Sequence, residues 1–295
     1  MTPEQAARLC CPLCKAALVL NQANPAQARQ QQLVCVHRHS FDVARQGYVN
    51  LHPVQYKQSK APGDSKEMID ARQAFLQAGH YTPIAARLTE LVQSYLAPRK
   101  TPDVPCVFDA GCGEGYYLDY LVSHLPDHAV SATGLDISKP AILAAARRTR
   151  EINWVVGTNA RPPLWPGQVD VLMCLFGFPV WEAFRSLLSD NGVVILVDAG
   201  PAHLLELREV IYPEVRQREV PSLEKAQAQG LKLIHSETLR FRTEALDQPT
   251  LQNLLLMTPH LFRATQEGKA AAARLSDFSV SVEAVFRVLA PHSPV

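Results

Sequence analysis

The chain has 295 residues, of which 47% are hydrophobic and 19% are charged, and its formal net charge at pH 7 is +1. This composition is that of a globular protein and excludes an intrinsically disordered chain, while the small net charge gives no sign of a polyanionic partner. The first twenty residues lack a continuous apolar stretch of the secretory type and no run is long enough to cross a bilayer, so we expect a soluble, cytoplasmic protein without membrane contact.

Cysteine and histidine residues cluster at the N-terminal end, where the sequence reads CCPLC and, further on, CVHRH. Cys11 and Cys14 form a C-x2-C pair, and Cys35 and His39 form a C-x3-H pair. Because cytosolic chains rarely keep disulfides, two such pairs are typical of a tetrahedral zinc site. Three thiolates and one imidazole leave no coordination position open, which predicts a structural zinc ion.

Two exchanges within this ligand set stay open. Cys10 could replace Cys11, although Pro12 in C-P-x-C favours Cys11 as the knuckle thiol. His37 could replace His39, but in a C-x-H pair the two ligands are separated by a single residue, which makes it difficult for both to bind one ion. The alternative to a metal site is a group of unliganded thiols, which would be reactive and poorly buried.

Two helices are predicted next along the chain. Asp64 or Ser65 can cap a helix over residues 65–78, which ends at Gly79. A second helix fits residues 83–96, with a proline in its first turn.

Strand and helix signals alternate from about residue 104 onward. Five short strands are predicted at VPCVFDA, AVSATGLDI, NWVVG, VDVLMCLF and VVILVDA, the last of them after a turn at Asn191-Gly192. Helices are predicted at GYYLDYLVSHL, KPAILAAARRTR, PVWEAFRSLL and PAHLLELREVIY. The runs LKLIHSETLRFR and FSVSVEAVFRVLA fit late, antiparallel strands, and residues 214–275 are otherwise expected to be mostly helical. This alternation predicts an α/β fold with a parallel sheet covered on both faces.

The first of these strands runs into a glycine-rich loop. Asp109 ends the strand, and Gly111, Gly113 and Gly115 form the turn that opens the next helix. Asp136 ends the second strand, 21 residues after Gly115, where a carboxylate can accept hydrogen bonds from a ribose diol. The sequence therefore predicts a ligand that carries a ribose.

The acidic residues of this loop distinguish between two classes of ribose ligand. A dinucleotide site reads G-x-G-x-x-G, and its doubly negative pyrophosphate is repelled by side chains such as Asp109 and Glu114. A sulfonium ligand with an ammonium group is cationic and tolerates them. The loop resembles motif I of the S-adenosylmethionine-dependent methyltransferases; a nicotinamide cofactor, or a turn without any ligand, is the alternative.

Longer motifs extend this resemblance to one family, the bacterial 23S ribosomal RNA (guanine-N1)-methyltransferases. The motifs that carry the resemblance occur in the same order as in the family: C-P-x-C with C-x3-H, FDVARQGYVNL, PGDSKEMIDARQAFLQAGHY, DAGCGEGYY, GLDISKPAI, GPAHLLELREVIY and LLLMTP. The resemblance implies a zinc-ribbon RNA-recognition domain, placed at 1–55, a linker with helices at 56–100, and a Rossmann-like methyltransferase domain at 101–295. It implies S-adenosylmethionine as donor, N1 of a guanine in a 23S rRNA hairpin loop as acceptor, and a homodimer with an RNA-binding cleft.

The family's motifs also imply roles for single residues. By this match the zinc ligands are Cys11, Cys14, Cys35 and His39. The match maps Tyr81, Gly113, Glu114 and His203 onto cofactor-contacting positions, and the loop chemistry adds Asp109, Gly111 and Asp136. For His203, a structural capping role is the alternative. Attack by N1 also requires a group that takes the N1 proton. Glu114 and Asp198 lie near strand ends, but the sequence assigns the role to neither, and the catalytic residue stays unassigned.

RNA loops are recognised by splaying bases onto aromatic or guanidinium faces. The predicted ribbon and linker carry side chains that suit this work, namely Arg38, Arg45, Tyr48, Tyr56, Lys57 and Lys60. Two other functions stay open: a methyltransferase for tRNA or a small molecule, and a non-catalytic RNA-binding protein. A basic surface would favour RNA over a small molecule, and the intact glycine loop and ribose carboxylate argue against a non-catalytic protein.

Three stretches depart from the family pattern. The Gln/Ala tract at 21–32 lengthens the zinc loop and is expected to be a flexible insertion. LFGFPVWEAF (175–184) is unusually apolar, and NARPPLWPG (159–167) is unusually rich in proline. We expect the last two to line the acceptor pocket.

Overall fold

The computed structural model describes residues 1–22, 31–56, 62–97, 104–125, 130–215, 219–258 and 264–292. Most of the Gln/Ala tract, together with Lys57 and Lys60 of the linker, lies outside these residues. No helix in the described part of the chain combines the length and the apolar character that crossing a membrane requires.

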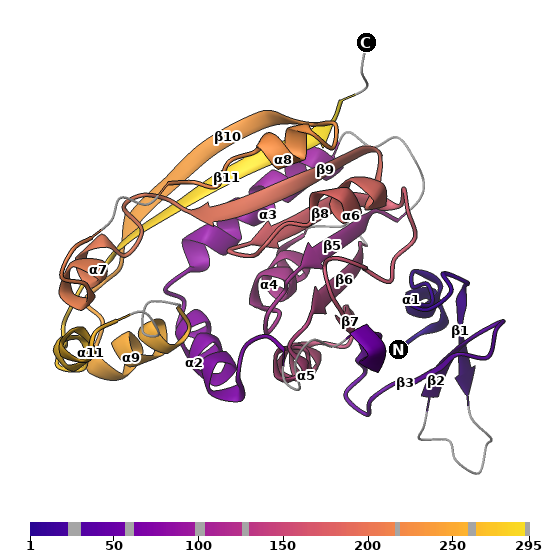
Figure 1. Ribbon diagram of the computed structural model, residues 1–295, viewed down its shortest axis with the longest axis horizontal. Helices are drawn as coiled ribbons and strands as arrows, with labels where there is room; N and C mark the ends of the chain where they lie inside the picture. Colours follow the sequence, from indigo (N-terminus) through magenta and orange to yellow (C-terminus); the bar gives the residue numbers. More distant parts are fainter. Residues whose placement is uncertain are drawn as a thin grey trace.

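The N-terminal part forms a small three-stranded sheet next to a short helix (Figure 1). Its elements are α1 (Pro3–Ala7), β1 (Leu18–Gln22), β2 (Gln31–Cys35) and β3 (Ser40–Asp42). The strands pair antiparallel in the order β1-β2-β3. The sequence reading missed α1, although Thr2 and Gln5 form a capping box at its start.

The rest of the chain is built on one eight-stranded sheet with the order β10-β11-β9-β8-β5-β6-β7-β4. Its strands are β4 (Val49–Asn50), β5 (Cys106–Ala110), β6 (Ser131–Asp136), β7 (Asn153–Val156), β8 (Val169–Leu175), β9 (Leu188–Ala199), β10 (Leu231–Arg242) and β11 (Ser281–Pro291). In this order, the six neighbouring strands from β9 through β4 are parallel, and β11 runs antiparallel to both β9 and β10. The predicted α/β fold, with a parallel sheet and late antiparallel strands, is confirmed.

Helices and the N-terminal three-stranded part, called the ribbon below, cover this sheet. The helical elements are the 3-10 turn η2 (Val54–Tyr56), α2 (Lys66–Gln77), α3 (Thr82–Leu96), α4 (Tyr116–His124), α5 (Lys139–Arg148), α6 (Trp181–Leu187), α7 (Leu205–Ile211), α8 (Glu224–Gln227), α9 (Gln248–Leu256) and α11 (Gln266–Ala272). Apolar residues of α3, α4 and α5 share one core with one face of the sheet, and those of α6 and the ribbon share a second core with the other face. α2 packs on α9 and α11 on α7, and Figure 1 shows these four helices far from the ribbon.

The start of α2 resolves one open alternative. The Ser65 hydroxyl caps the helix by accepting a hydrogen bond from the Met68 N–H at 3.3 Å. Asp64 instead forms an ion pair with Arg72, with 2.6 Å between Oδ2 and Nη2. The helix ends as predicted before Gly79, whose φ of +87° is the left-handed conformation that favours glycine.

The predicted turn at Asn191-Gly192 lies inside β9 instead of before it. Leu188 already pairs with Val169, and the next pair along the two strands is Val193 with Val171. The residues between Leu188 and Val193 therefore form an irregularity within the strand. A side chain at Gly192 would approach the Val169 carbonyl oxygen to 2.5 Å, so the glycine serves close packing there.

The helix predicted over residues 201–212 also begins later, at Leu205. Leu204 has a φ of +54°, a left-handed conformation that interrupts a helix.

The ribbon is joined to the large sheet by its last strand and by the proline-rich segment. β4 pairs in parallel with β7, which places Val49 opposite Val155. In segment 159–167, the Pro163 carbonyl accepts the Cys10 N–H at 2.9 Å, and the Trp165 indole donates to the Ala7 carbonyl at 3.1 Å. The later part of the segment that we expected at the acceptor pocket therefore docks the ribbon, whereas Asn159 at its start lies near the glycine loop, with its Nδ2 3.8 Å from the position that a Cβ at Gly111 would take.

Candidate functional site

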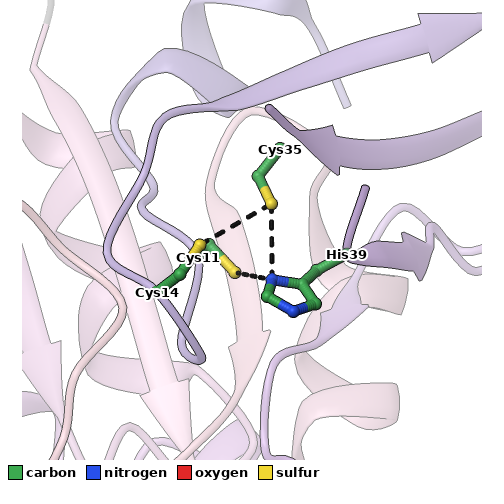
Figure 2. Close-up of side chains that lie close together, drawn as sticks. All are labelled: Cys11, Cys14, Cys35 and His39. Atoms are coloured by element: carbon green, nitrogen blue, oxygen red, sulfur yellow. Dashed lines mark hydrogen bonds between the residues drawn. The ribbon is translucent and has the colours of Figure 1, made fainter. Parts of the chain in front are cut away.

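The two cysteine and histidine pairs meet at one point of the ribbon (Figure 2). One ligand atom from each of Cys11, Cys14, Cys35 and His39 lies within 4.8 Å of all the others. His39 Nδ1 is 3.4 Å from Cys11 Sγ and 3.5 Å from Cys35 Sγ, and Cys14 Sγ is 3.7 Å from Cys35 Sγ. Tetrahedral zinc with Zn–S bonds of about 2.3 Å separates its sulfur ligands by about 3.8 Å. The donor set and its spacing fit a closed, structural zinc site.

A hydrogen-bonded turn begins at the first cysteine of each pair. The Cys11 carbonyl accepts the Lys15 N–H at 2.8 Å, and the Cys35 carbonyl accepts the Arg38 N–H at 2.9 Å. Lys15 and Arg38 have φ values of 58° and 64°, an uncommon left-handed conformation for residues other than glycine. The first turn spans five residues and the second spans four, and each contains one of these left-handed residues.

Cys10 and His37 lie outside this cluster. The Cys10 thiol is buried and donates to the Leu164 carbonyl oxygen at 3.4 Å, toward the proline-rich segment. His37 is exposed, and its Nδ1 lies 3.3 Å from Cys14 Sγ, where it can hydrogen-bond to that sulfur. Outer hydrogen bonds of this kind orient ligand atoms at metal sites.

The glycine loop lies at the carboxyl end of β5. The Gly111 and Cys112 N–H groups both donate to the Leu135 carbonyl, at 2.8 and 3.0 Å, which anchors the loop to β6. A side chain at Gly115 would come within 2.6 Å of the Trp154 ring, so this glycine permits packing. At Gly111 and Gly113 the nearest atoms are side-chain ends at 3.8 and 3.4 Å, and a ligand can approach the backbone there.

Two carboxylates border this part of the loop. Asp136 accepts the Gly113 N–H at 3.0 Å and the Ser138 N–H at 2.7 Å, one on each oxygen. Asp109 is buried, and its Oδ1 has no hydrogen-bond partner among the described residues. Buried polar atoms are normally paired, so this oxygen indicates a donor that a ligand brings, such as an ammonium group. The residues present therefore fit a cationic ligand with a ribose.

Glu114 and Asp198, the two carboxylates near strand ends, are both held by arginines. Glu114 Oε1 is 3.1 Å from Arg148 Nη2, and Arg148 Nε also donates to the Glu114 carbonyl at 2.9 Å. Burial raises the pKa of Glu114, and the Arg148 charge opposes that rise. Asp198 accepts a hydrogen bond from Arg287 at 2.7 Å. A role in proton removal would require either carboxylate to leave its ion pair.

Tyr81 and His203 are brought together by the fold. Both are buried, and Tyr81 Oη lies 3.4 Å from His203 Nε2. The Glu283 N–H donates to His203 Nδ1 at 3.4 Å, which leaves Nε2 facing the tyrosine hydroxyl. The Phe75 ring packs edge-on against Tyr81 at 5.1 Å, which fixes this wall of the site.

The apolar stretch after β8 lies beside this pair. The Phe176 ring is centred 6.0 Å from His203 and 6.5 Å from Tyr117. Phe176 has a φ of 50°, and sparsely populated backbone conformations of this kind cluster at functional sites. Phe178 is 89% exposed, an unusual position for a large apolar side chain.

The sequence reading missed Arg72, whose guanidinium lies over the glycine loop. Arg72 Nη1 is 3.4 Å from the position that a Cβ at Gly113 would take. The contact joins α2 to a loop about forty residues away, and no local pattern signals it.

Of the residues proposed to contact RNA, the arginines are exposed, and the two tyrosines differ in their surroundings. Arg38 and Arg45 are exposed, whereas Tyr48 is buried in the core, which excludes base stacking on it. The Arg161 guanidinium lies 4.5 Å from the centre of the Tyr56 ring and forms a mixed cationic and aromatic surface.

The fold and the glycine loop define this protein as an S-adenosylmethionine-dependent methyltransferase with a structural zinc ribbon. A family model described as RlmA, N-terminal, a zinc ribbon, matches residues 9–60, and a methyltransferase-domain model matches residues 107–192. The chain belongs to the family of the 23S rRNA (guanine-N1)-methyltransferases, as three curated relatives show.

The 23S rRNA (guanine(748)-N(1))-methyltransferase of Streptomyces fradiae is 30% identical over 287 residues, which cover 95% of this chain and 96% of that protein. A relative from Micromonospora griseorubida is 37% identical over 222 residues, covering 70% of each chain. YxjB of Bacillus subtilis (strain 168) is 29% identical over 279 residues, covering 92% of this chain and 93% of its own. The proteins from Micromonospora griseorubida and Bacillus subtilis each carry the name of a 23S rRNA (guanine-N(1)-)-methyltransferase.

We expect the Asp109→Asn variant to gain stability over the wild type as pH rises. Burial, and after it the charges of Asp136 and Glu114, raise the pKa of Asp109 to about 8. A pKa above that of the unfolded chain means that folding favours the protonated form. The stability that protonated Asp109 contributes to the folded wild type is complete below about pH 4 and is lost as pH rises through 8. Urea unfolding of both proteins without ligand at several pH values measures this difference. Curves that stay parallel from pH 5 to 9 would contradict it.

Proposed function

We propose that this protein transfers a methyl group from S-adenosylmethionine to N1 of a guanine in a hairpin loop of 23S rRNA. The observation that carries this proposal is the glycine loop of a methyltransferase in the same molecule as a zinc ribbon, in a chain of this family. The ribbon, residues 1–55, would recognise RNA, the methyltransferase domain, residues 101–295, would hold the donor, and residues 56–100 would join them.

The donor supplies a methyl group activated on a sulfonium, and the chain binds and orients it. We propose that Asp136 accepts hydrogen bonds from the ribose diol with the lone pairs that the Gly113 and Ser138 N–H groups leave over. Asp109 receives the ammonium group on its unpartnered oxygen. Gly111 and Gly113 let the backbone approach the donor, and Glu114 contributes its backbone beside them while its side chain stays with Arg148. Tyr81 and His203 form the opposite wall.

The acceptor base is held by aromatic side chains in this proposal. A guanine in a loop can be splayed out and stacked, because its base is not locked in a helix. Phe176 lies beside His203, and Phe178, two residues further along the chain, is exposed. These rings offer faces on which the base can stack with N1 directed at the donor. The proton on N1 leaves during the transfer, and the surrounding water can accept it.

Exposed cationic side chains support an RNA acceptor over a small molecule. Arg38 and Arg45 of the ribbon are exposed, and so are Arg150 and Arg161 of the methyltransferase domain. The Arg150 guanidinium donates to the Arg45 carbonyl at 3.3 Å, so the Arg150 charge lies where the two parts of the protein meet. Basic groups of this kind neutralise phosphates. In this proposal the protein acts in the cytoplasm as a homodimer, which light scattering of the purified protein tests.

The proposal predicts methyl transfer to unmodified 23S rRNA transcript, with N1-methylguanosine as the product. Tritiated S-adenosylmethionine measures the transfer, and mass spectrometry of the digested RNA identifies the nucleoside. A Phe178→Ala variant should bind the donor normally but lose most of the transfer, because it lacks one stacking face worth about 1–3 kcal/mol. Donor binding without transfer to 23S rRNA would reject this substrate. Transfer to tRNA alone would support the alternative enzyme.

A further inference from the structure

The Arg72 guanidinium occupies the open side of the glycine loop. Its Nη1 lies 3.4 Å from the position that a Cβ at Gly113 would take. Its Nη2 is 2.6 Å from Asp64 Oδ2 and donates to the Met257 carbonyl at 3.4 Å. The side chain is 23% exposed, so it is largely withdrawn from water. These contacts hold the guanidinium at the loop while Nη1 remains directed toward Gly113.

The charges around the loop do not complete a site for an amino acid. Asp109, Glu114 and Asp136 are acidic, which suits an ammonium group and a ribose. The methionine part of the donor also carries a carboxylate, which requires a cationic partner. Arg148 is engaged by Glu114. Within the part of the chain that the structure describes, Arg72 is the cation that lies against the open side of Gly113.

We propose that Arg72 binds the α-carboxylate of the methionine moiety of S-adenosylmethionine. The inference rests on the proposed function for the identity of the donor. A planar guanidinium matches a carboxylate in geometry and forms short, charge-assisted hydrogen bonds with it. Asp64 holds the guanidinium through Nη2, while Nη1 lies at Gly113. Arg72 thus complements Asp109, and the two side chains separate the opposite charges of the amino acid group.

The alternative is that Arg72 has a purely structural role. The contacts of Arg72 with Asp64 and Met257 join α2 to the preceding linker and to the end of α9. Loss of these contacts would weaken the binding of every ligand of the loop by the same factor. Loss of a carboxylate partner would weaken only ligands that carry the carboxylate. The choice of ligand therefore distinguishes the two roles.

The test measures the binding of S-adenosylmethionine and of decarboxylated S-adenosylmethionine by isothermal titration calorimetry on the full chain. The decarboxylated compound keeps the sulfonium, the ribose and the ammonium group. For Arg72→Ala we expect S-adenosylmethionine to bind about 10- to 100-fold more weakly, the range expected for a hydrogen bond to a charged group. Binding of the decarboxylated compound should change by less than about threefold. Arg72→Lys should fall between, because it keeps the charge without the fork.

Two further variants keep the test decisive. Arg147→Ala removes an exposed arginine from the neighbouring helix α5 and should leave both affinities unchanged. Asp64→Asn breaks the ion pair but keeps the guanidinium, so the preference for the carboxylate should persist. If Arg72→Ala does not fold, as thermal melting would show, Arg72→Lys and Arg72→Gln give the same comparison.

Equal weakening of both ligands by Arg72→Ala, or a preference for the carboxylate that survives it, would overturn the inference. Neither result would affect the proposed function, because the wild type would still bind the donor and methylate RNA. Failure of the wild type to bind S-adenosylmethionine would instead contradict the proposed function itself.

Discussion

Replacing Cys11 with serine is expected to abolish zinc binding, whereas the same change at the neighbouring Cys10 should leave the zinc in place. Cys11 Sγ belongs to the cluster of four ligand atoms, and Cys10 Sγ is directed at the Leu164 carbonyl. Structural zinc sites contribute about 10–16 kcal/mol of apparent binding free energy to small domains, which is more than such a domain's net stability. Loss of the ion should therefore unfold the ribbon.

The zinc content of the two purified variants, measured by inductively coupled plasma mass spectrometry, checks this expectation. Hydrogen exchange should show loss of protection in β1, β2 and β3 of Cys11→Ser alone. The two parts of the protein share one core, in which Leu9 and Leu33 of the ribbon join Phe108 and Leu135 of the sheet. We therefore also expect a lower melting temperature for the whole chain. Zinc retained by Cys11→Ser and lost by Cys10→Ser would show that the ligand set is wrong.

Replacing Asp136 with alanine is expected to weaken donor binding by at least about 100-fold, which combines the loss of two or more hydrogen bonds to a charged group. Asp136 holds the Gly113 and Ser138 N–H groups with its two oxygens. Its removal leaves both groups without their acceptor and takes away the proposed partner of the ribose diol. Asp136→Asn should be milder, because its amide oxygen can still accept one of these hydrogen bonds.

Calorimetric titration with S-adenosylhomocysteine measures this effect without any contribution from RNA. Asp190→Ala is the matched control, since Asp190 is an exposed carboxylate in the irregular part of β9. Binding by Asp136→Ala within about threefold of the wild type would show that this carboxylate does not hold the donor.

Local features of the chain could be predicted from the sequence because they depend on neighbouring residues. The order of strand, glycine loop and helix follows from apolar spacing and from the conformational freedom of Gly111, Gly113 and Gly115. A helix cap at Asp64 or Ser65 follows from the chemistry of a side-chain oxygen beside unpaired N–H groups. Where two neighbours had the same chemistry, as with Asp64 and Ser65, the sequence left the choice open.

Features that depend on long-range packing could not be predicted in this way. The joining of β4 to β7, and the docking of the ribbon on the proline-rich segment, bring together parts of the chain about a hundred residues or more apart. No periodicity within either part contains this information. The engagement of Glu114 by Arg148 similarly changes a candidate for catalysis into a member of an ion pair.

The sequence by itself determined the fold class, the family, and two sets of candidate residues, for zinc and for the donor. The fold class and the candidate residues follow from ligand spacing, turn formation and apolar periodicity, which are properties of short segments, and the family follows from the resemblance of longer motifs. Only the tertiary structure decided that Cys10 faces Leu164, that Tyr81 meets His203, and that Arg72 lies over Gly113. Those contacts depend on which surfaces pack together, and packing is set by the whole chain.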